Sequence, residues 1–204
     1  MISRRELLSA AAVMALLPSV AFAQSAEEPA ALIQKFYDAL LDAMKRGPEL
    51  GFDGRYELLV PVLNDTFDIG TMCRIAVGPD WTKMPGDKKG ALLQVFDRYI
   101  VTTYAARFKK FNNLKFEIGE TKDAGDGKKL VETKLTRANG EVVELNYLFR
   151  QNENAWRVID IYLAGAISQM AQLRAEFGQS LRQGGADQLM VELEKKIEDL
   201  KKEA

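Results

Sequence analysis

Histidine is missing from the 204-residue sequence, and its absence excludes several kinds of active site. Ser-His-Asp triads, Cys-His dyads and imidazole metal ligands all need the side chain that this chain lacks. Most hydrolase and zinc-site functions are therefore excluded. Any catalysis would have to rely on carboxylates, tyrosines or lysines.

Cysteine is nearly absent as well. The single cysteine, Cys73, has no second thiol with which to form an intramolecular disulfide, so the fold must be stabilised by packing. No histidine is available to activate the thiol. We therefore interpret Cys73 as a small buried hydrophobic residue in preference to a nucleophile.

Metal-binding and phosphate-binding motifs are also missing. The pairs Asp65 with Asp68 and Asp123 with Asp126 lack the alternating oxygen ligands and the final glutamate of a calcium loop. The glycines at 125 and 127 precede a predicted strand, whereas a phosphate loop opens a helix. These carboxylates are interpreted as caps and turns, and we expect neither a metal nor a cofactor.

The sequence has no marked excess of basic or acidic residues, since it contains 28 basic and 29 acidic ones. A nucleic-acid-binding domain usually carries a basic excess on one face, so nucleic acid is excluded as a partner. Long apolar runs are absent too. Beyond Ala23 no segment approaches the roughly 20 apolar residues that a membrane span needs, and the mature chain is expected to be soluble.

The first 23 residues have the organisation of an export signal. Arg4 and Arg5 precede an apolar run too short to span a bilayer, and Ala-Phe-Ala at 21–23 forms a cleavage site with small residues. The arginine pair also approximates a twin-arginine signal but lacks the usual Phe and following Lys, so the general and twin-arginine routes both stay open. We expect cleavage after Ala23 and a periplasmic domain of residues 24–204.

Helical periodicity dominates the first half of the mature chain. Apolar residues recur at helical spacing up to about Arg46, from about 55 to 67, and from 69 to 77, where Asp68 is a plausible N-cap. The longest predicted helix runs from about 87 to 111 and gathers large aromatic residues on one broad face. That face fits either a filled core or the wall of an apolar cavity.

After this helix the apolar period changes from about 3.6 to 2. Alternation over 114–118, 131–136 and 143–150, followed by the apolar run 156–164, predicts four strands. Turn-forming residues separate them, so the strands should form an antiparallel meander. A helix should follow Gly165, end near Gly184 and Gly185, and be succeeded by a solvated, weakly docked final helix.

Asp160 is unusual because it lies in the middle of the apolar fourth strand. A buried carboxylate either finds partners or has a raised pKa, which would suit a general base. The structural alternative is a pairing with Arg157, with Arg150 or with backbone groups near a helix start. The sequence leaves both interpretations open.

Taken together, the pattern predicts a single α+β domain in which about five or six helices pack on a curved four-stranded antiparallel sheet. Bulky apolar surface is plentiful and catalytic groups are scarce. An exported, nearly neutral, histidine-free protein of this kind is expected to carry an apolar ligand.

The order of several motifs resembles the MlaC or toluene-tolerance auxiliary family over nearly the whole mature chain. The motifs are Thr66-Phe67-Asp68-Ile69 to Gly78-Pro79-Asp80-Trp81, Phe96 to Tyr104-Ala105, Trp156-Arg157-Val158-Ile159-Asp160, and Gly165 to Phe177. The resemblance implies a periplasmic carrier that moves phospholipid between an outer-membrane lipoprotein complex and an inner-membrane ABC transporter complex. The stretches 166–169 and 184–187 look closer to the hopanoid-associated branch, HpnM, so phospholipid and hopanoid-type lipid both remain candidate ligands.

On this interpretation the longest helix and the apolar sheet face enclose the lipid, with the head group at the mouth, and the carrier is a monomer without catalytic residues. The residues predicted to line the cavity are Phe96, Tyr99, Ile100, Tyr104, Phe108, Val143, Leu145, Tyr147, Phe149, Val158 and Tyr162. Two other functions stay open. One is a small cone-fold, isomerase-like enzyme that uses Asp160 with Tyr162 or Tyr147 in an apolar pocket. The other is a structural adaptor with a filled core.

Overall fold

The computed structural model describes residues 27–152 and 155–204, and the predicted signal at 1–23 lies outside this part of the chain. Within it, six helices pack against one five-stranded antiparallel sheet. The helices are α1 (Pro29–Lys45), α2 (Gly47–Thr66), α3 (Ile69–Val77), α4 (Asp80–Lys83), α5 (Gly86–Arg107) and α6 (Gln169–Glu203). The strands are β1 (Lys115–Gly125), β2 (Lys128–Thr136), β3 (Val142–Asn152), β4 (Ala155–Leu163) and β5 (Ile167–Ser168).

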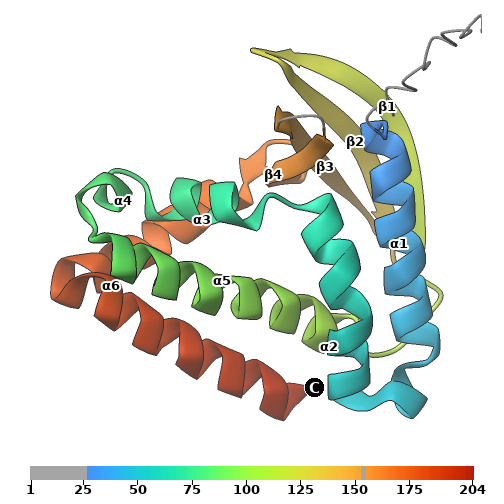
Figure 1. The fold of residues 1–204 in the computed structure, drawn as a ribbon. Coiled ribbons are helices and arrows are strands. Elements are labelled where there is room, and N and C mark those ends of the chain that lie inside the picture. The colour runs from blue at the N-terminus through green and yellow to red at the C-terminus, as the bar shows by residue number, and fades with distance from the viewer. Residues whose placement is uncertain (1–26, 153–154) are drawn as a thin grey trace, which may run out of the picture.

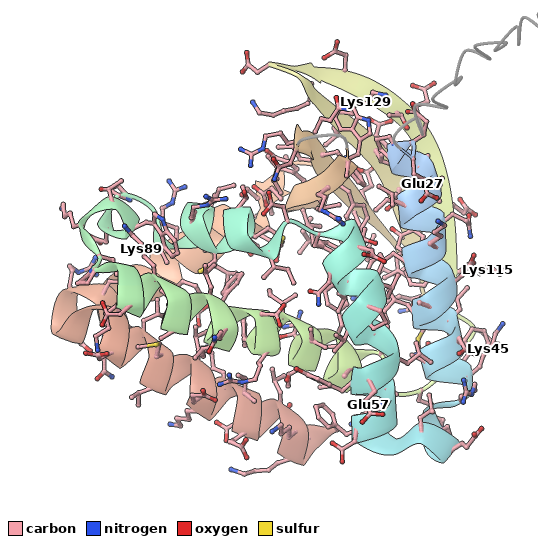
Figure 2. The ribbon with its side chains drawn as sticks, in the orientation of Figure 1. Glu27, Lys45, Glu57, Lys89, Lys115 and Lys129 are labelled. Carbon is pink, nitrogen blue, oxygen red and sulfur yellow. The ribbon has the colours of Figure 1, made fainter. Side chains whose placement is uncertain are left out.

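The sheet curves around one side of the molecule, with α1 lying against it and α5 and α6 running side by side (Figure 1). Charged side chains such as Lys45, Glu57 and Lys115 lie on the outside, while the apolar faces of the helices meet the sheet (Figure 2). The predicted α+β class is confirmed. The sheet has one strand more than predicted, because residues 167–168, which were expected to begin a helix, form the two-residue strand β5.

The predicted helices are present, with shifted ends. The second helix was predicted from about residue 55, but α2 already begins at Gly47, because the proline at position 48 suits a first helical turn. Its kink lies at Gly51, where φ is 61°, although Pro61 is also inside the helix. The longest predicted helix, α5, ends at Arg107, short of the predicted residue 111.

Strand β5 exists because the chain reverses direction immediately after β4. Ala164 and Gly165 adopt positive φ angles of 50° and 75°. The turn brings Ile167 opposite Leu163 and Ser168 opposite Tyr162. The Ser168 hydroxyl then accepts a hydrogen bond from the backbone N–H of Ala171 and caps α6.

A β-bulge in β4 changes which side chains face the helices. Phe149 pairs with Val158 and Tyr147 pairs with Ile161, so β4 has one more residue than β3 in this interval. Cross-strand partners share a face, which places Val158 and Ile161 on the same side of the sheet. Asp160 therefore lies on the opposite face.

An aromatic cluster joins the sheet to the helices. The ring of Phe36 in α1 packs edge-on against Phe67, Tyr104 and Tyr147, with centroid distances of 5.1, 5.3 and 6.3 Å. Phe36 is fully buried. Edge-to-face aromatic pairs are favourable beyond the area that they bury. This cluster therefore sets the position of α1 and α5 relative to β3.

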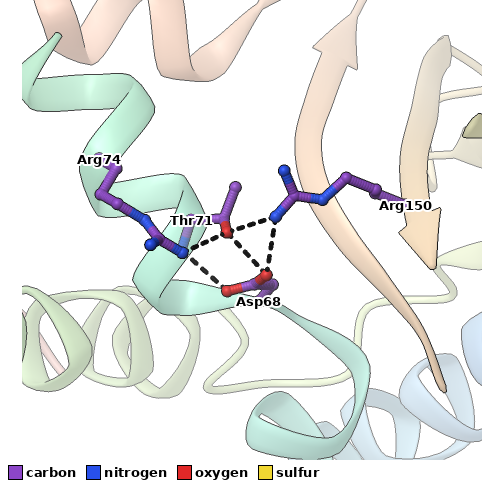
Figure 3. A network of polar contacts seen from close by, with 4 residues as sticks. All are labelled: Asp68, Thr71, Arg74 and Arg150. Carbon is purple, nitrogen blue, oxygen red and sulfur yellow. Dashed lines mark hydrogen bonds and ion pairs between the residues drawn. The ribbon is translucent and has the colours of Figure 1, made fainter. Parts of the chain in front are cut away.

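The start of α3 is held to the sheet by a polar network (Figure 3). As predicted, Asp68 caps the helix, accepting a hydrogen bond from the backbone N–H of Thr71 at 2.8 Å. Arg150 of β3 donates to the Thr71 hydroxyl at 2.8 Å and lies 3.4 Å from the Asp68 carboxylate. The partly buried helix start is thus satisfied by its own cap, and Arg150 from the sheet holds the capping side chains in place.

The long C-terminal segment α6 is a helical hairpin. Gly184 and Gly185 have non-helical backbone angles, and Glu176 before the bend lies 2.5 Å from Lys196 after it. Leu189, Leu193 and Ile197 in the second arm are buried. The prediction of a weakly docked final helix is therefore wrong. The narrow apolar stripe of the second arm is sufficient to hold this arm in place, because the first arm and α5 both cover the stripe.

Gly185→Ala is expected to lower the free energy of unfolding by about 1–3 kcal/mol. The native backbone of Gly185, with φ 63° and ψ −148°, belongs to a region that only glycine occupies without strain. Urea denaturation of the two proteins measures the change. Gly90→Ala is the matched control, since Gly90 lies in α5 with open space around its Cα. That variant should gain about 0.5–1 kcal/mol; equal stability of Gly185→Ala and the parent would contradict the prediction.

Candidate functional site

A cavity of about 440 Å³ lies between β3 and β4 of the sheet, α5 and the start of α6. Most of its wall is aliphatic or aromatic. The lining residues are Leu40, Met72, Tyr99, Ile100, Thr103, Tyr104, Arg107, Phe108, Phe116, Leu145, Tyr147, Ile161, Leu163, Gln169, Met170, Gln172, Leu173 and Glu176. Its volume lies within the range of roughly 300–1,000 Å³ that is usual for ligand pockets.

Regular secondary structure positions the wall. Tyr99, Thr103 and Arg107 follow one another at intervals of four residues along α5, so they share one face of the helix. On the sheet side, Leu145 and Tyr147 of β3 point the same way because strand side chains alternate. The aromatic face of α5 and the apolar face of the sheet therefore meet across the cavity.

The structure brings only part of the predicted lining together. Among the predicted residues, those that line the cavity are Tyr99, Ile100, Tyr104, Phe108, Leu145 and Tyr147. Those that do not are Phe96, Val143, Phe149, Val158 and Tyr162.

The predicted residues that do not line the cavity lie elsewhere in the fold. Phe96 is fully buried and packs edge-on against Phe177 of α6, 6.2 Å between ring centroids. Phe149 and Val158 are paired with each other across the two strands and have no exposed surface. They therefore belong to the close-packed core and do not face the cavity. Tyr162 pairs with Asn146 on the face of the sheet away from the helices.

Several lining residues were missed by sequence reasoning. Ile161 and Leu163 were missed because the bulge shifts the alternation of β4 by one residue. Phe116 carried a usable signal, since it alternates with charged neighbours in β1. Met170 and Leu173 lie at helical spacing in α6 and could have been included for the same reason.

Two tyrosines of the cavity wall, Tyr104 and Tyr147, are held in the neutral form. The Tyr147 hydroxyl accepts a hydrogen bond from the Tyr37 hydroxyl at 3.2 Å, and Tyr37 also lies 2.6 Å from the hydroxyl of Thr133. Burial raises the pKa of Tyr147 well above its ordinary value, and burial likewise raises the pKa of Tyr104. The inner wall therefore presents no charge to a ligand.

Polar groups gather at the rim. Of the lining residues, Arg107, Gln172 and Glu176 are exposed to solvent. The Glu176 carboxylate lies 2.5 Å from the Lys196 ammonium, so its charge is largely compensated. A ligand with an apolar body and a polar end would match this distribution of surface.

Asp160 does not line the cavity. Its carboxylate is buried and accepts hydrogen bonds from the Ser168 hydroxyl at 2.5 Å and from the backbone N–H groups of Ile161 and Met170 at 2.7 and 3.1 Å. Of the structural partners considered, the backbone at a helix start is the one found. Asp160 therefore anchors β5 and α6 to β4, and the isomerase-like interpretation has no support from its position.

The arginines considered as partners of Asp160 bind elsewhere. Arg150 contacts Thr71, and Arg157 donates to the carbonyl oxygen of Asn64 at 3.0 Å.

Cys73 is fully buried, and burial raises the pKa of its thiol to about 12. A thiol in that state is a poor nucleophile, which agrees with its interpretation as a hydrophobic residue.

Comparison with known proteins identifies the family. A profile of the family described as MlaC protein matches residues 34–195, which is well over half of the sequence. The chain belongs to the MlaC family. No curated protein matches the chain closely enough to count as a relative.

A solved structure has the same fold as this MlaC-family chain. It is described as the phospholipid-binding protein from Ralstonia solanacearum in complex with a phospholipid. The TM-score is 0.74 at 21% sequence identity, and the alignment covers 85% of this chain and 99% of the other. At this identity the likeness establishes the fold.

Motif residues that carry the resemblance to the MlaC family have structural roles here. Gly78 ends α3 with a φ of 69°, and a Cβ atom there would lie 3.2 Å from the Arg174 side chain. Arg174 of α6 donates a hydrogen bond to the carbonyl oxygen of Ile75 at 2.9 Å. Two segments far apart in sequence are thus joined.

Every helix in 27–152 and 155–204 falls short of the length or apolar content that a membrane crossing requires.

Proposed function

We propose that this protein is a periplasmic lipid carrier. In this proposal it moves a phospholipid or hopanoid-type lipid between the outer and inner membranes as the soluble component of an ABC-transporter-linked system. The observation that carries the proposal is the apolar cavity with a polar rim, in a chain of the MlaC family. The Ralstonia solanacearum protein of the same fold, which holds a phospholipid, adds support.

The physical task explains why such a protein needs a cavity and no catalytic group. Transfer of one buried CH₂ group into water costs about 0.8 kcal/mol, so a free two-chain lipid faces a barrier of roughly tens of kcal/mol. An apolar cavity replaces one apolar environment with another. Tyr104 of α5 and Phe108, which follows the last residue of that helix, would contact the chains from one side. Leu145 and Ile161 would contact them from the sheet side.

Lipid transport also needs one membrane complex that supplies the lipid and another that receives it. We propose transient docking of a monomer to an outer-membrane lipoprotein complex and to an inner-membrane ABC transporter complex. The cavity rim between α5 and α6 is the opening through which a lipid would pass, because Arg107, Gln172 and Glu176 are its exposed residues. A purely structural adaptor would need no cavity, and an enzyme using Asp160 would need that residue inside it.

Gently purified protein is expected to contain lipid at up to one molecule per chain. Native mass spectrometry of the protein from its periplasmic extract should show an added mass, and extraction with organic solvent followed by lipid analysis should identify it. A sample unfolded in denaturant before buffer exchange is the control and should lose the added mass. If no lipid is recovered and none can be loaded from vesicles, the proposal fails.

A further inference from the structure

We infer that Arg107 is a specificity-determining residue that binds the phosphate of a phospholipid at the cavity mouth, which rests on the proposed carrier function. Arg107 is the only Lys or Arg among the lining residues. It is the last residue of α5 and is exposed. Among the described residues it has no hydrogen bond or ion pair through its side chain, so its guanidinium is available to a ligand.

The other charged side chain of the cavity lining, Glu176, is already paired. Glu176 is paired with Lys196 at 2.5 Å, and Arg98, further back along α5, is paired with Glu194. The rim of the cavity therefore combines one compensated carboxylate with one uncompensated guanidinium. A negatively charged group at the mouth would be attracted by Arg107, and the paired Glu176 would repel it only weakly.

A structural role explains only some of these observations. A cation in the last turn interacts favourably with the helix dipole, and the carbon stem of an arginine can cover apolar surface. Lysine would do both. Neither role requires the residue to share the cavity face with Thr103 and Phe108. The planar guanidinium is suited to bind two phosphate oxygens at once, which is the property that a head-group site needs.

This assignment narrows the ligand class. Acyl chains fill the neutral inner wall formed by residues such as Tyr147, while the phosphate stays at the solvent-exposed rim beside Arg107. A neutral lipid with the same chains, or a hopanoid without phosphate, would gain only the apolar contacts. Inorganic phosphate would gain only the contact with Arg107. The site should therefore prefer phospholipids over both.

The test is a competition between two lipids that differ only in phosphate. Delipidated protein is offered equal amounts of phosphatidylglycerol and of diacylglycerol with identical chains, and occupancy is measured by native mass spectrometry. The parent protein should prefer phosphatidylglycerol by roughly tenfold to a hundredfold, the usual range for a charged hydrogen bond. Arg107→Gln should lose most of this preference and still load diacylglycerol, whereas Arg107→Lys should keep part of it.

Arg98→Gln is the matched control, because it removes an exposed arginine of the same helix that does not line the cavity. Its preference should equal that of the parent. An unchanged preference in Arg107→Gln, or equal loading of both lipids by the parent, would overturn the inference and leave the carrier function standing. Loading of neither lipid by the parent would instead refute the carrier function.

A further experiment tests whether the site binds the phosphate of a lipid or free inorganic phosphate. Millimolar inorganic phosphate should not displace phosphatidylglycerol from the parent protein, because it cannot replace the apolar contacts. Displacement would assign the site to free phosphate and overturn the lipid assignment. Thermal unfolding of each variant, followed by circular dichroism, should shift by at most a few degrees, since Arg107 is exposed and its glutamine variant loses only the interaction with the helix dipole. The comparison of two lipids in the parent does not depend on any variant.

Discussion

Leu145→Trp is expected to lower lipid occupancy by at least roughly tenfold without unfolding the protein. Leu145 of β3 lines the cavity and is only partly buried, so an indole can extend into the space that a chain would occupy. Excluding three or four CH₂ groups at about 0.8 kcal/mol each removes about 2–3 kcal/mol of binding free energy. Loading of a fluorescent phospholipid from vesicles, measured per mole of protein, checks the loss.

Val142→Trp is the matched control for this experiment. Val142 begins the same strand, is 54% exposed and does not line the cavity. It is three residues from Leu145, so its side chain points to the other face of β3. This variant should load lipid like the parent. If Leu145→Trp also loads like the parent, the lipid does not occupy the cavity between the sheet and α5.

Asp160→Ala is expected to lower the free energy of unfolding by about 3 kcal/mol or more. The substitution removes the acceptor of the buried backbone N–H of Met170. It also removes the acceptor of two partly buried donors, the backbone N–H of Ile161 and the hydroxyl of Ser168. Each buried donor that loses its partner costs about 1–3 kcal/mol. The start of α6 and the attachment of β5 should both be weakened. Urea denaturation followed by tryptophan fluorescence measures the effect.

Asp160→Asn separates the anchor from a catalytic role. The amide keeps one oxygen to accept from the backbone of Met170, so the loss should be clearly smaller than for alanine, and lipid loading should stay close to that of the parent. The anchoring role would be contradicted if alanine at this position were as stable as aspartate. Complete loss of loading in a folded Asp160→Asn protein would point instead to a direct role at the cavity.

Much of the architecture could be predicted because it depends on local patterns. The change of apolar period from about 3.6 to 2 after residue 111 separates helices from strands, and the turn residues between strands imply an antiparallel meander. The cap at Asp68 and the bend at Gly184 and Gly185 are equally local. Composition was also informative, since the absence of histidine excludes whole classes of site before any fold is known.

The site was predicted only in part, because its remaining features depend on pairs of residues far apart in sequence. Lys196 compensates Glu176 across the helical hairpin, and no pattern within either arm indicates that contact. Arg107 is distinguished from Arg98 only by what lies opposite each of them in space.

The bulge opposite Phe149 is the clearest case. The sequence by itself determined the class of fold, the order of its strands and the apolar character of one sheet face, because those follow from spacing along the chain. Only the tertiary structure decided that Ile161, and not Tyr162, faces the cavity and that Asp160 anchors a helix. A bulge is set by the register of two paired strands, and one extra residue reverses the direction of every side chain beyond it.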